Sequence, residues 1–454
     1  MPMKSLIAMG VGLLLLVLQP GPGWTQTSDE RMRQLEQELS RMRQDIEALR
    51  KEQAEAAKQP AKLPIELGAS ITVRYDLTDV EDQLELRLDE NRDGFRTRDR
   101  FWAEFRPDGP VNAGIRLSTG ENPNPTSPFI RFGDLGRSKS FNLDQFWLAV
   151  RPIKFFDTRP LEAQPADVAL LAGRMPQPFW RGSRGTWSSE LIWDDDVSPE
   201  GFVVKLNASQ LAPGLQLQAT AGYFVIEEVD NFRFAGLTGN TFLAAGQVKA
   251  EYKPVAVALA LYGFNRLNAG LRSPNFTPGV GAVVTPGQSA LLLRDPGLQR
   301  TNNRIDFGPG AEGFVEDTFN ILNFTGQLYY PLAVMPQFAP EVFLVGDYAR
   351  NLSVDRDRTG YGITVGLRGG GKPGSGVNPY NLWLTYRNVD ADATLATVAD
   401  SDLGNGTSYR GIEAGVNYRL HKHLLLQISG FAFNAGPHKD IYWRRVFFDV
   451  VANF

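Results

Sequence analysis

The 454-residue sequence contains no cysteine, only three histidines and little net charge. Without cysteine the chain can form no disulfide bond, no thiolate metal site and no lipid-modified N-terminal cysteine. A formal net charge of −4 indicates neither a nucleic-acid surface nor a polyanionic tail. The sequence also lacks a glycine-rich phosphate loop and haem-attachment cysteines, so we expect no nucleotide, no redox cofactor and no bound metal.

Long apolar runs are missing after the first 20 residues or so. A later run such as Val255–Phe264 is only strand-sized, whereas a transmembrane helix needs about 20 apolar residues. Near the start, Lys4 precedes the apolar stretch Leu6–Leu18, and small residues follow it. This pattern predicts a signal peptide over residues 1–25, with an uncleaved anchor as the alternative. In either case we expect the chain to leave the cytoplasm.

Residues 26–60 differ in composition from the rest of the chain and predict a periplasmic helix. Residues 29–58 are rich in Glu, Gln, Arg and Ala and contain neither Gly nor Pro. Apolar residues alternate three and four positions apart, which is the seam pattern of a coiled coil. Opposite charges at the g and following e positions favour a parallel homo-oligomer over a single solvated helix. The seam consists of Met32, Leu35, Leu39, Met42, Ile46 and Leu49.

From residue 61 to residue 454 the hydrophobic period changes to two. In the first such segment Ile71 and Val73 share one face, while Thr72 and Arg74 lie on the other. Alternation of this kind indicates half-buried β-strands. Because soluble β-sandwiches alternate as well, the pattern alone does not separate a sandwich from a membrane barrel.

Three further features favour a transmembrane barrel. About sixteen such segments occur, and an even strand number is typical of bacterial barrels. Short and long connectors tend to alternate, like periplasmic turns and outer loops. The last segment, Val446–Phe454, ends in an aromatic residue and resembles the C-terminal signal of outer-membrane barrels. The segments begin near residues 65, 99, 111, 143, 168, 202, 214, 242, 255, 319, 339, 359, 377, 409, 423 and 443.

The predicted fold is therefore all-β, a transmembrane antiparallel β-barrel of about 16 strands preceded by a short α-helical coiled coil. With both barrel ends in the periplasm, the connector at 175–201 becomes the third outer loop. It contains "SSELIWDDDVSPEG", in which Asp194, Asp195 and Asp196 stand in a row. Three adjacent carboxylates repel one another, so we expect them either to pair with positive charges or to serve a function.

We expect this loop to fold into the lumen, where its acidic residues face basic wall residues across a constriction. Two alternatives stay open: the aspartates cap turns or pair with the loop's own arginines, or they bind Ca²⁺, although their spacing differs from that of an EF-hand. The predicted constriction residues are Arg174, Arg181, Arg184, Glu190, Asp194, Asp195, Asp196 and Glu200. The predicted basic lumen-wall residues are Arg74, Arg106, Arg116, Lys205, Lys249, Arg368, Arg387 and Arg419.

The segments "LLAGRMPQPFW" and "SSELIWDDDVSPEGF" resemble the signature of a family of bacterial putative porins. In that family a Gly-Arg strand end precedes a loop with Trp-Asp-Asp-Asp and Pro-Glu-Gly. The resemblance covers most of the chain, and its specific part lies within residues 170–202. It implies an outer-membrane barrel and a homotrimer, but no particular solute.

We therefore predict an outer-membrane porin, a water-filled channel for passive diffusion of small hydrophilic solutes and ions. The expected partners are other copies of the chain, outer-membrane lipids and, through the coiled coil, the cell wall. One rival is a substrate-specific porin for phosphate, another anion or an oligosaccharide. Another is a structural tether whose barrel is plugged, for which the connector 266–318 is long enough. An enzyme is not expected, because His421, His423 and His438 lack a serine at a convincing spacing.

Overall fold

The fold was analysed in a computed structural model of the chain, which describes the barrel and most of its connectors. The described residues are 65–81, 92–105, 110–120, 126–133, 138–156, 166–183, 187–227, 240–268, 302–308, 311–332, 340–370, 378–404, 406–436 and 439–454, together with 37, 40, 41, 44 and 47. The predicted signal peptide and all six seam residues of the coiled coil lie outside them. No helix among these residues is long and apolar enough to cross a membrane.

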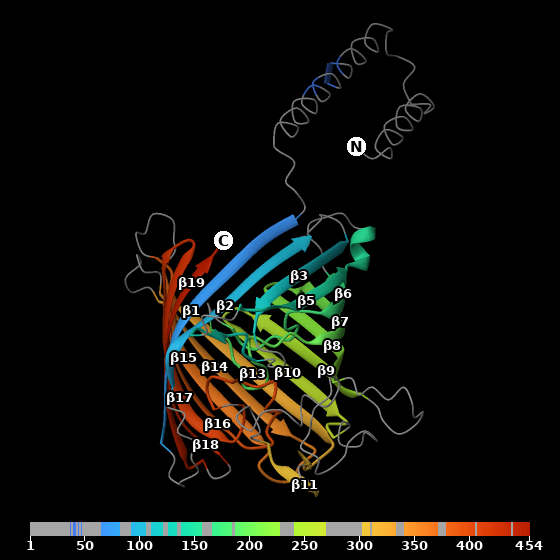
Figure 1. The fold of residues 1–454 in the computed structure, drawn as a ribbon. Coiled ribbons are helices and arrows are strands. Elements are labelled where there is room, and N and C mark those ends of the chain that lie inside the picture. The colour runs from blue at the N-terminus through green and yellow to red at the C-terminus, as the bar shows by residue number, and fades with distance from the viewer. Residues whose placement is uncertain are drawn as a thin grey trace, which may run out of the picture. The chain divides into compact units, whose positions relative to one another are not determined.

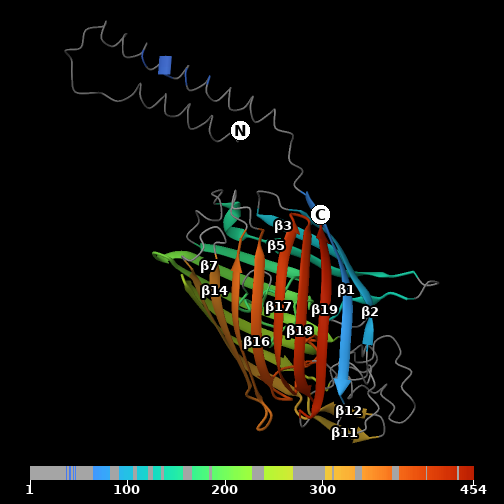
Figure 2. The same ribbon diagram turned by 90° about the vertical axis from the view of Figure 1, so that its left-hand side faces the viewer.

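The described part of the chain is almost entirely β-structure (Figures 1 and 2). The elements of its first half are β1 (Ile65–Glu81), β2 (Arg92–Phe105), β3 (Val111–Thr119), β4 (Ile130–Arg131), β5 (Phe141–Val150), η1 (Pro152–Phe155), β6 (Ala166–Arg174), β7 (Glu200–Ala212), β8 (Leu215–Glu227) and β9 (Thr241–Tyr252). Those of the second half are β10 (Val255–Asn265), β11 (Arg304–Gly308), β12 (Ala311–Phe314), β13 (Thr318–Pro331), β14 (Glu341–Asn351), β15 (Thr359–Gly369), β16 (Tyr380–Val389), β17 (Tyr409–His421), β18 (Leu424–Ala435) and β19 (Ile441–Asn453).

Sixteen of these strands form a closed antiparallel barrel, which confirms the predicted architecture. The ring contains every strand except the short β4, which pairs with β2, and the separate hairpin of β11 and β12. It closes where β1 pairs with β19, with Tyr75 opposite Phe448. The terminal Phe454 takes part in this seam, because its backbone N–H donates to the carbonyl of Ala69 at 2.9 Å. Closure leaves no exposed sheet edge, as a membrane-spanning sheet requires.

The two faces of the wall differ in chemistry. On β10, Leu259 and Leu261 are exposed, while the alternating Ala258 and Ala260 are buried. On β1, Ile71 and Leu77 are exposed, while Thr72, Arg74 and Asp76 are buried. The same alternation recurs around the ring and gives the barrel an apolar outer band and an interior that carries charge. Such a wall is stable in hydrocarbon because its backbone groups pair within the sheet and its outward side chains are apolar.

The predicted strand starts agree with the structure, with one larger difference. The start near residue 99 is in fact Arg92, because the alternation continues upstream through the arginines of β2. Sequence reasoning put the start where the aromatic pair Phe101 and Trp102 makes the pattern strong. The connector 152–167, longer than a periplasmic turn usually is, contains the single helical turn η1.

The inside of the barrel divides into two parts with different chemistry. One part, here called the apolar sector, is formed by the inward residues of β7–β10, β13 and β14. It includes Val203, Phe224, Leu243, Tyr262, Phe264, Phe319 and Ile321, all buried. The other part, here called the polar sector, is centred on the inward residues of β1–β3 and β5, which carry most of the arginine–carboxylate pairs described below. β18 and β19 contribute to both parts, through Asp449 to the ion pairs and through Phe431, Phe433 and Phe447 to the hydrophobic cluster.

Candidate pore constriction

The connector between β6 and β7 lies inside the barrel. Its neck is closed by a hydrogen bond from the Met175 N–H to the Pro199 carbonyl at 2.9 Å, and Met175 itself is fully buried. Phe179 stands edge-on to Tyr262 of β10 at 5.2 Å between ring centroids. Trp193, only 1% exposed, lies 5.8 Å from the same tyrosine and 6.1 Å from Phe264. Aromatic packing against the apolar sector therefore holds this loop in the lumen.

A glycine allows one turn of the loop to approach the wall. Gly182 has a φ of +69°, and a Cβ built there would lie 2.8 Å from Val345 Cγ1 and 2.9 Å from Thr325 Cγ2. Any larger residue would meet both the left-handed backbone conformation and these two wall side chains. Nearby, the Trp180 backbone both donates to and accepts from the side chain of Gln247 of β9, at 2.7 and 2.8 Å.

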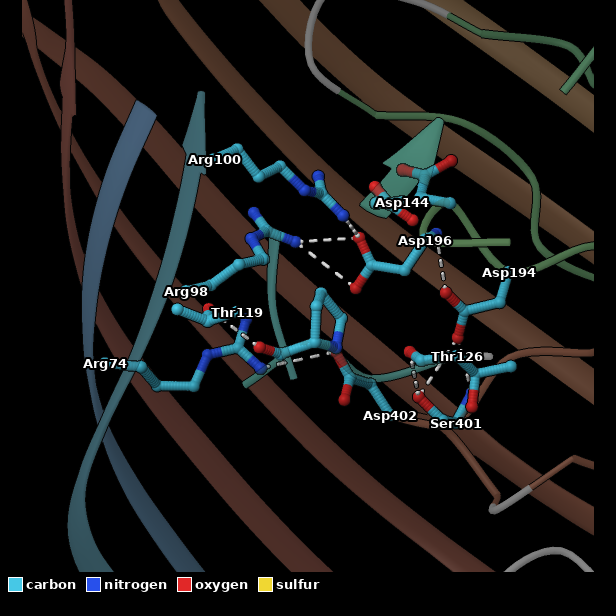
Figure 3. A network of polar contacts seen from close by, with 12 residues as sticks. Arg74, Arg98, Arg100, Thr119, Thr126, Asp144, Asp194, Asp196, Ser401 and Asp402 are labelled. Carbon is cyan, nitrogen blue, oxygen red and sulfur yellow. Dashed lines mark hydrogen bonds and ion pairs between the residues drawn. The ribbon is translucent and has the colours of Figure 1, made fainter. Parts of the chain in front are cut away.

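Asp196 crosses the lumen to the polar sector. Its carboxylate accepts hydrogen bonds from Arg98 Nη1 at 2.9 Å and Arg100 Nη2 at 2.7 Å, both from β2 (Figure 3). Burial by itself would raise the pKa of Asp196, but the two guanidinium groups outweigh it and lower this pKa. Asp196 thus stays ionised and ties the loop to the opposite wall.

The other two aspartates have different partners. Asp195 pairs with Arg181 of the same loop and accepts a hydrogen bond from the Ser188 hydroxyl at 2.6 Å. Asp194 accepts hydrogen bonds from the Ser401 N–H and hydroxyl at 3.1 and 3.0 Å (Figure 3). Burial, and then repulsion from neighbouring carboxylates such as Asp196, raise the pKa of Asp194 well above its ordinary value.

A second connector, between β16 and β17, also lies in the lumen. The Asp194 N–H donates to the Val398 carbonyl at 2.8 Å, and the Asp400 N–H donates to the Glu190 carbonyl at 3.3 Å. Asp400 forms a buried ion pair with Arg387 of β16. The loop at 175–199 and the connector at 390–408 are therefore hydrogen-bonded to each other within the barrel.

Residues from the connector after β3 complete the site. The Thr126 carbonyl accepts a hydrogen bond from the Ser401 hydroxyl at 3.3 Å. Phe129 lies under the Arg74 guanidinium, 4.1 Å from its ring centroid, and Phe447 of β19 lies at the same distance. Arg74 also binds Asp449 through two hydrogen bonds of 2.9 and 3.0 Å. The guanidinium is therefore held by two rings and one carboxylate.

These elements enclose a polar cavity of about 190 Å³ between the two loops and the wall. Its lining includes Arg74 and Arg98 of the wall, Asp194, Asp195 and Asp196 of the first loop, and Asp402 of the second. A cavity of roughly 150 Å³ can hold a benzene molecule, so this space admits several waters or a small solute. It lies where charges of opposite sign face each other across the lumen.

The predicted constriction residues fall into three groups. Arg181, Glu190, Asp194, Asp195 and Asp196 come together at the cavity or beside it. Arg174 lies at the end of β6 and donates from Nε to the Asp144 carbonyl at 2.7 Å. Glu200, at the start of β7, is exposed in the same alternation as the outward Phe202 and does not line the cavity. Arg184 lies outside the described residues.

The predicted wall residues are distributed along the whole lumen. Arg74 lines the cavity, Arg116 binds Asp144 at 2.5 Å, and Arg387 anchors the second loop. The remaining described wall residues line other parts of the barrel. Lys249 pairs with Glu251 at 2.8 Å, Arg368 pairs with Glu341 at 2.9 Å, Arg419 donates to the Lys422 carbonyl at 3.2 Å, and Lys205 is half-buried on β7. Arg106 lies outside the described residues.

Sequence reasoning missed several residues of the site. Arg98 was overlooked because β2 was expected to begin near 99. Arg100 lies within the predicted strand and was also overlooked, although the alternating arginines of "RTRDR" share one face of β2. Asp144 was missed because a β-bulge interrupts the pairing of β3 with β5, and a bulge places two successive residues on one face. Asp400 and Asp402 belong to a connector whose entry into the lumen has no local sequence signal.

The described residues give the calcium alternative no support. Among them, no cluster of three or more His, Asp or Glu side chains is arranged to hold a metal ion. Asp196 and Asp195 instead bind arginines, and Asp194 binds a serine and backbone groups. The other two interpretations, a lumen constriction and a structural role, both agree with these contacts, because the aspartates lie in the lumen and also hold the loop in place.

Comparison with known proteins places the chain among porins. Residues 20–432 match the model of a family described as "Putative porin". No curated protein matches. The fold is similar to that of Pseudomonas putida OprB at high pH, with 10% identity, a TM-score of 0.47, and 86% and 94% of the two chains covered. Salmonella typhi OmpF has 12% identity, a TM-score of 0.47 and coverages of 86% and 97%. A mutant Rhodopseudomonas blastica porin has 13% identity, a TM-score of 0.41 and coverages of 86% and 100%.

Proposed function

The chain belongs to the Putative porin family and is a porin of the outer membrane, and we propose that its channel conducts small hydrophilic solutes and ions by passive diffusion. The passage runs between the loop at 175–199 and the arginines of β1 and β2. The observation that carries this proposal is Asp196 held by Arg98 and Arg100 beside an open polar cavity. Opposed fixed charges in a narrow passage orient water and select ions by sign and size.

A narrow pore fits the division of the lumen better than a wide one. The apolar side chains of the apolar sector pack with Phe179 and Trp193 of the loop and fill that side of the lumen. Polar groups on the same strands, such as Gln247 and Asp347, are hydrogen-bonded to the loop. The polar cavity lies instead along the polar sector. Permeation is therefore expected to be off-centre in the barrel. The rival tether function would require this remaining passage to be closed.

We also propose that three copies associate through the barrel wall. Three of the four shortest strands of the ring, β3, β5 and β6, are consecutive along it and have nine, ten and nine residues; the fourth, β16, has ten. They carry exposed outward apolar side chains such as Phe141, Leu143 and Leu148. A transmembrane strand needs roughly 9–11 residues, so these strands span the membrane with little excess length. This lowest part of the wall, with its exposed apolar side chains, is suited to contact with a neighbouring copy.

The N-terminal predictions complete the proposal. A signal peptide at 1–25 would deliver the chain to the periplasm, and a coiled coil at 26–60 would support the trimer from the periplasmic side and reach the cell wall. The barrel would then comprise residues 61–454. The described positions 37, 40, 41, 44 and 47 are helical and exposed, as a helix in this segment would require.

The family and the fold indicate a channel rather than an enzyme. His421 and His423 lie at the turn between β17 and β18, with ring centroids 5.5 Å apart. His423 Nδ1 contacts the Asn453 carbonyl at 2.6 Å, and its ring stacks on Phe454 at 6.0 Å. The contacts of His423 tie the last strand to the turn, which is a structural use of this histidine.

Single-channel recording in a planar bilayer tests the proposal. Native protein is compared with a variant in which Asp194, Asp195 and Asp196 are all changed to Asn, and Glu200→Gln serves as the control for charge outside the cavity. We expect open channels, conductance steps in threes, and a cation preference that falls in the triple variant but not in the control. Correctly folded barrels that never conduct would disprove the porin function and favour the tether.

A further inference from the structure

The connector at 390–408 is buried to a degree unusual for a loop. Ala393, Thr394, Leu395, Ala396 and Leu403 are fully enclosed, whereas connecting segments normally run over the protein surface. Val398, Leu395 and Leu403 join the same hydrophobic cluster as Trp193 and Phe179 of the first loop. The second loop is therefore a packed element of the lumen.

Polar contacts hold this connector from several sides. The Asn302 side chain donates to the carbonyls of Ala391 and Thr394 at 2.7 and 2.8 Å and accepts from the Ala396 N–H at 2.9 Å. The Asn351 side chain donates to the Asp392 carbonyl at 2.9 Å. Together with the Arg387–Asp400 ion pair, whose side chains are each 2% exposed, these contacts fix the backbone of the loop.

The tip of the connector brings Asp402 to the cavity. Arg445 of β19 donates to the carbonyls of Ser401 and Asp402 at 3.0 and 2.8 Å, which sets the backbone at this point. The Asp402 side chain is 42% exposed and lines the cavity.

Most carboxylates at this cavity are neutralised by a close guanidinium, but Asp402 is not fully neutralised. Asp196 has Arg98 and Arg100, Asp195 has Arg181, and Asp449 has both strong contacts of Arg74. Arg74 reaches Asp402 only with its remaining nitrogen, at 3.5 Å. One guanidinium is thus shared by two carboxylates. The Arg445 guanidinium also lies near Asp402, but the half-exposed Asp402 carboxylate keeps one side open to the cavity.

Carboxyl groups are frequent in the lining of the cavity. Seven carboxyl side chains line it together with the guanidinium groups of Arg74 and Arg98, while Arg100, Arg181 and Arg387 pair with three of these carboxylates from outside the lining. Glu190 accepts a hydrogen bond from the Asp195 N–H of its own loop at 2.8 Å, whereas Asp194 joins the two loops through Ser401. Among the carboxylates that line the cavity, Asp402 is half-exposed, and its ion-pair contact with Arg74 is long, at 3.5 Å. A mobile cation can therefore replace the missing partner there.

We infer that the connector at 390–408 is a second constriction loop, and that Asp402 on it determines a preference for small cations over anions. The inference rests on the proposed porin function and adds to it the class of preferred solute, namely monovalent inorganic cations and small organic ammonium ions. Fixed negative charge at a narrow, protein-lined site raises the local concentration of cations and lowers that of anions.

Reversal potentials in a potassium chloride gradient test the role of Asp402. The Asp402→Asn channel is compared with native protein and with Asp355→Asn, the same change at an exposed position between β14 and β15. We expect the potassium-to-chloride permeability ratio to fall roughly threefold to fivefold in Asp402→Asn, as for loss of one unit charge about 4 Å from the ion path. Asp355→Asn should leave the ratio unchanged.

A chemical test uses the absence of cysteine from the chain. In Asp402→Cys the introduced thiol is unique, so charged methanethiosulfonate reagents modify only this position. We expect the positively charged reagent to react, to reduce conductance stepwise and to reverse the selectivity, whereas the negatively charged reagent should restore the cation preference. Tetramethylammonium is then used as the organic probe, and its permeability should follow that of potassium.

The outcomes separate the two proposals. Open native channels whose selectivity does not change in Asp402→Asn, or an Asp402→Cys channel that reagents never affect, would overturn the role of the second loop and leave the porin function intact. Native barrels that are folded but do not conduct would overturn both.

Discussion

The two sectors of the lumen use the same alternating wall for different purposes. In the apolar sector, inward Phe224, Tyr262 and Phe264 pack against Trp193 of the first loop. In the polar sector, inward Arg74, Arg98 and Arg100 face carboxylates across a cavity. The comparison shows that a porin-like barrel can place a packed core on one side of its lumen and a charged passage on the other.

Energetics explain why the two sectors are separate. Burial of large apolar side chains stabilises by about 1.5–3 kcal/mol for each residue, so the apolar sector can hold both loops in place. Ion pairs contribute little net stability, because desolvation offsets much of their attraction. The polar sector is therefore suited to selecting ions and to fixing the positions of the loops, while the apolar sector supplies the stability of the loops in the lumen.

The largest expected effect comes from emptying the apolar sector. Trp193→Ala removes an almost fully buried ring and should cost about 3–5 kcal/mol of loop packing. The loop should then detach, with higher and noisier single-channel conductance and faster proteolysis between residues 175 and 199. The control is Phe202→Ala, on the outward face of β7. If the Trp193 variant had native conductance and native protease resistance, the apolar sector would not be what holds the loop.

A similar effect is expected where a charge of the second loop is buried. Arg387→Met leaves Asp400 without its partner in a site where both side chains are almost fully enclosed. Leaving a buried charge without its partner should lower the free energy of unfolding by about 3–5 kcal/mol. Denaturant midpoints measured in detergent should fall for the single variant and largely recover in Arg387→Met/Asp400→Leu. Equal midpoints for the single and double variants would show that the ion pair does not hold the loop.

Within the polar sector the expected effect is on selectivity rather than on stability. Arg98→Gln/Arg100→Gln leaves Asp196 without both guanidinium partners, which adds uncompensated negative charge to the cavity. The cation-to-anion permeability ratio should rise about threefold or more. Arg444→Gln, an exposed arginine of β19, is the matched control. A ratio that falls instead would place the ion path away from Asp196.

The pH dependence should separate neighbouring aspartates. The pKa of Asp194 is raised by burial, whereas that of Asp196 is lowered by Arg98 and Arg100. A carboxylate loses its charge as pH falls through its pKa, so Asp194 should become neutral at a pH well above the ordinary value of about 3.9, and Asp196 only below it. Reversal potentials measured during acidification should show an early loss of selectivity that is missing in Asp194→Asn. A single late step in both proteins would contradict this order.

The smallest effect is expected outside both sectors. Glu200→Gln changes an exposed outward carboxylate next to the lumen loop. Conductance, selectivity and stability should stay within experimental error, since exposed surface charges contribute little. A selectivity change as large as that of the aspartate variants would mean that the outer mouth, not the cavity, selects ions.

Much of the fold could be predicted because it depends on local pattern. The period-two alternation identified the strands, and the apolar ending at Phe454 indicated the closing strand, which pairs with β1. The "WDDD" segment identified the lumen loop by its concentration of charge. These features are local because every transmembrane strand must present apolar side chains to lipid, whatever its neighbours are.

The partners across the lumen could not be predicted in the same way. Arg98 and Asp196 lie almost a hundred residues apart, and Asp402 and Arg74 more than three hundred. Their contacts depend on barrel closure and on how each loop folds inward. The β-bulge that turns Asp144 inward is likewise a property of the pairing of β3 with β5. The periodicity within one strand carries no information about which distant residues will meet.

The sequence by itself determined the barrel, its strand number and the faces of its wall, because the membrane imposes one rule on each strand separately. Only the tertiary structure decided which half of the lumen is packed and which is charged. It also decided that a second loop enters the barrel beside the first. Those features depend on side chains that meet only after the barrel has closed. Their interaction energies come from pairs of residues far apart in the chain, so no single segment of the sequence shows them.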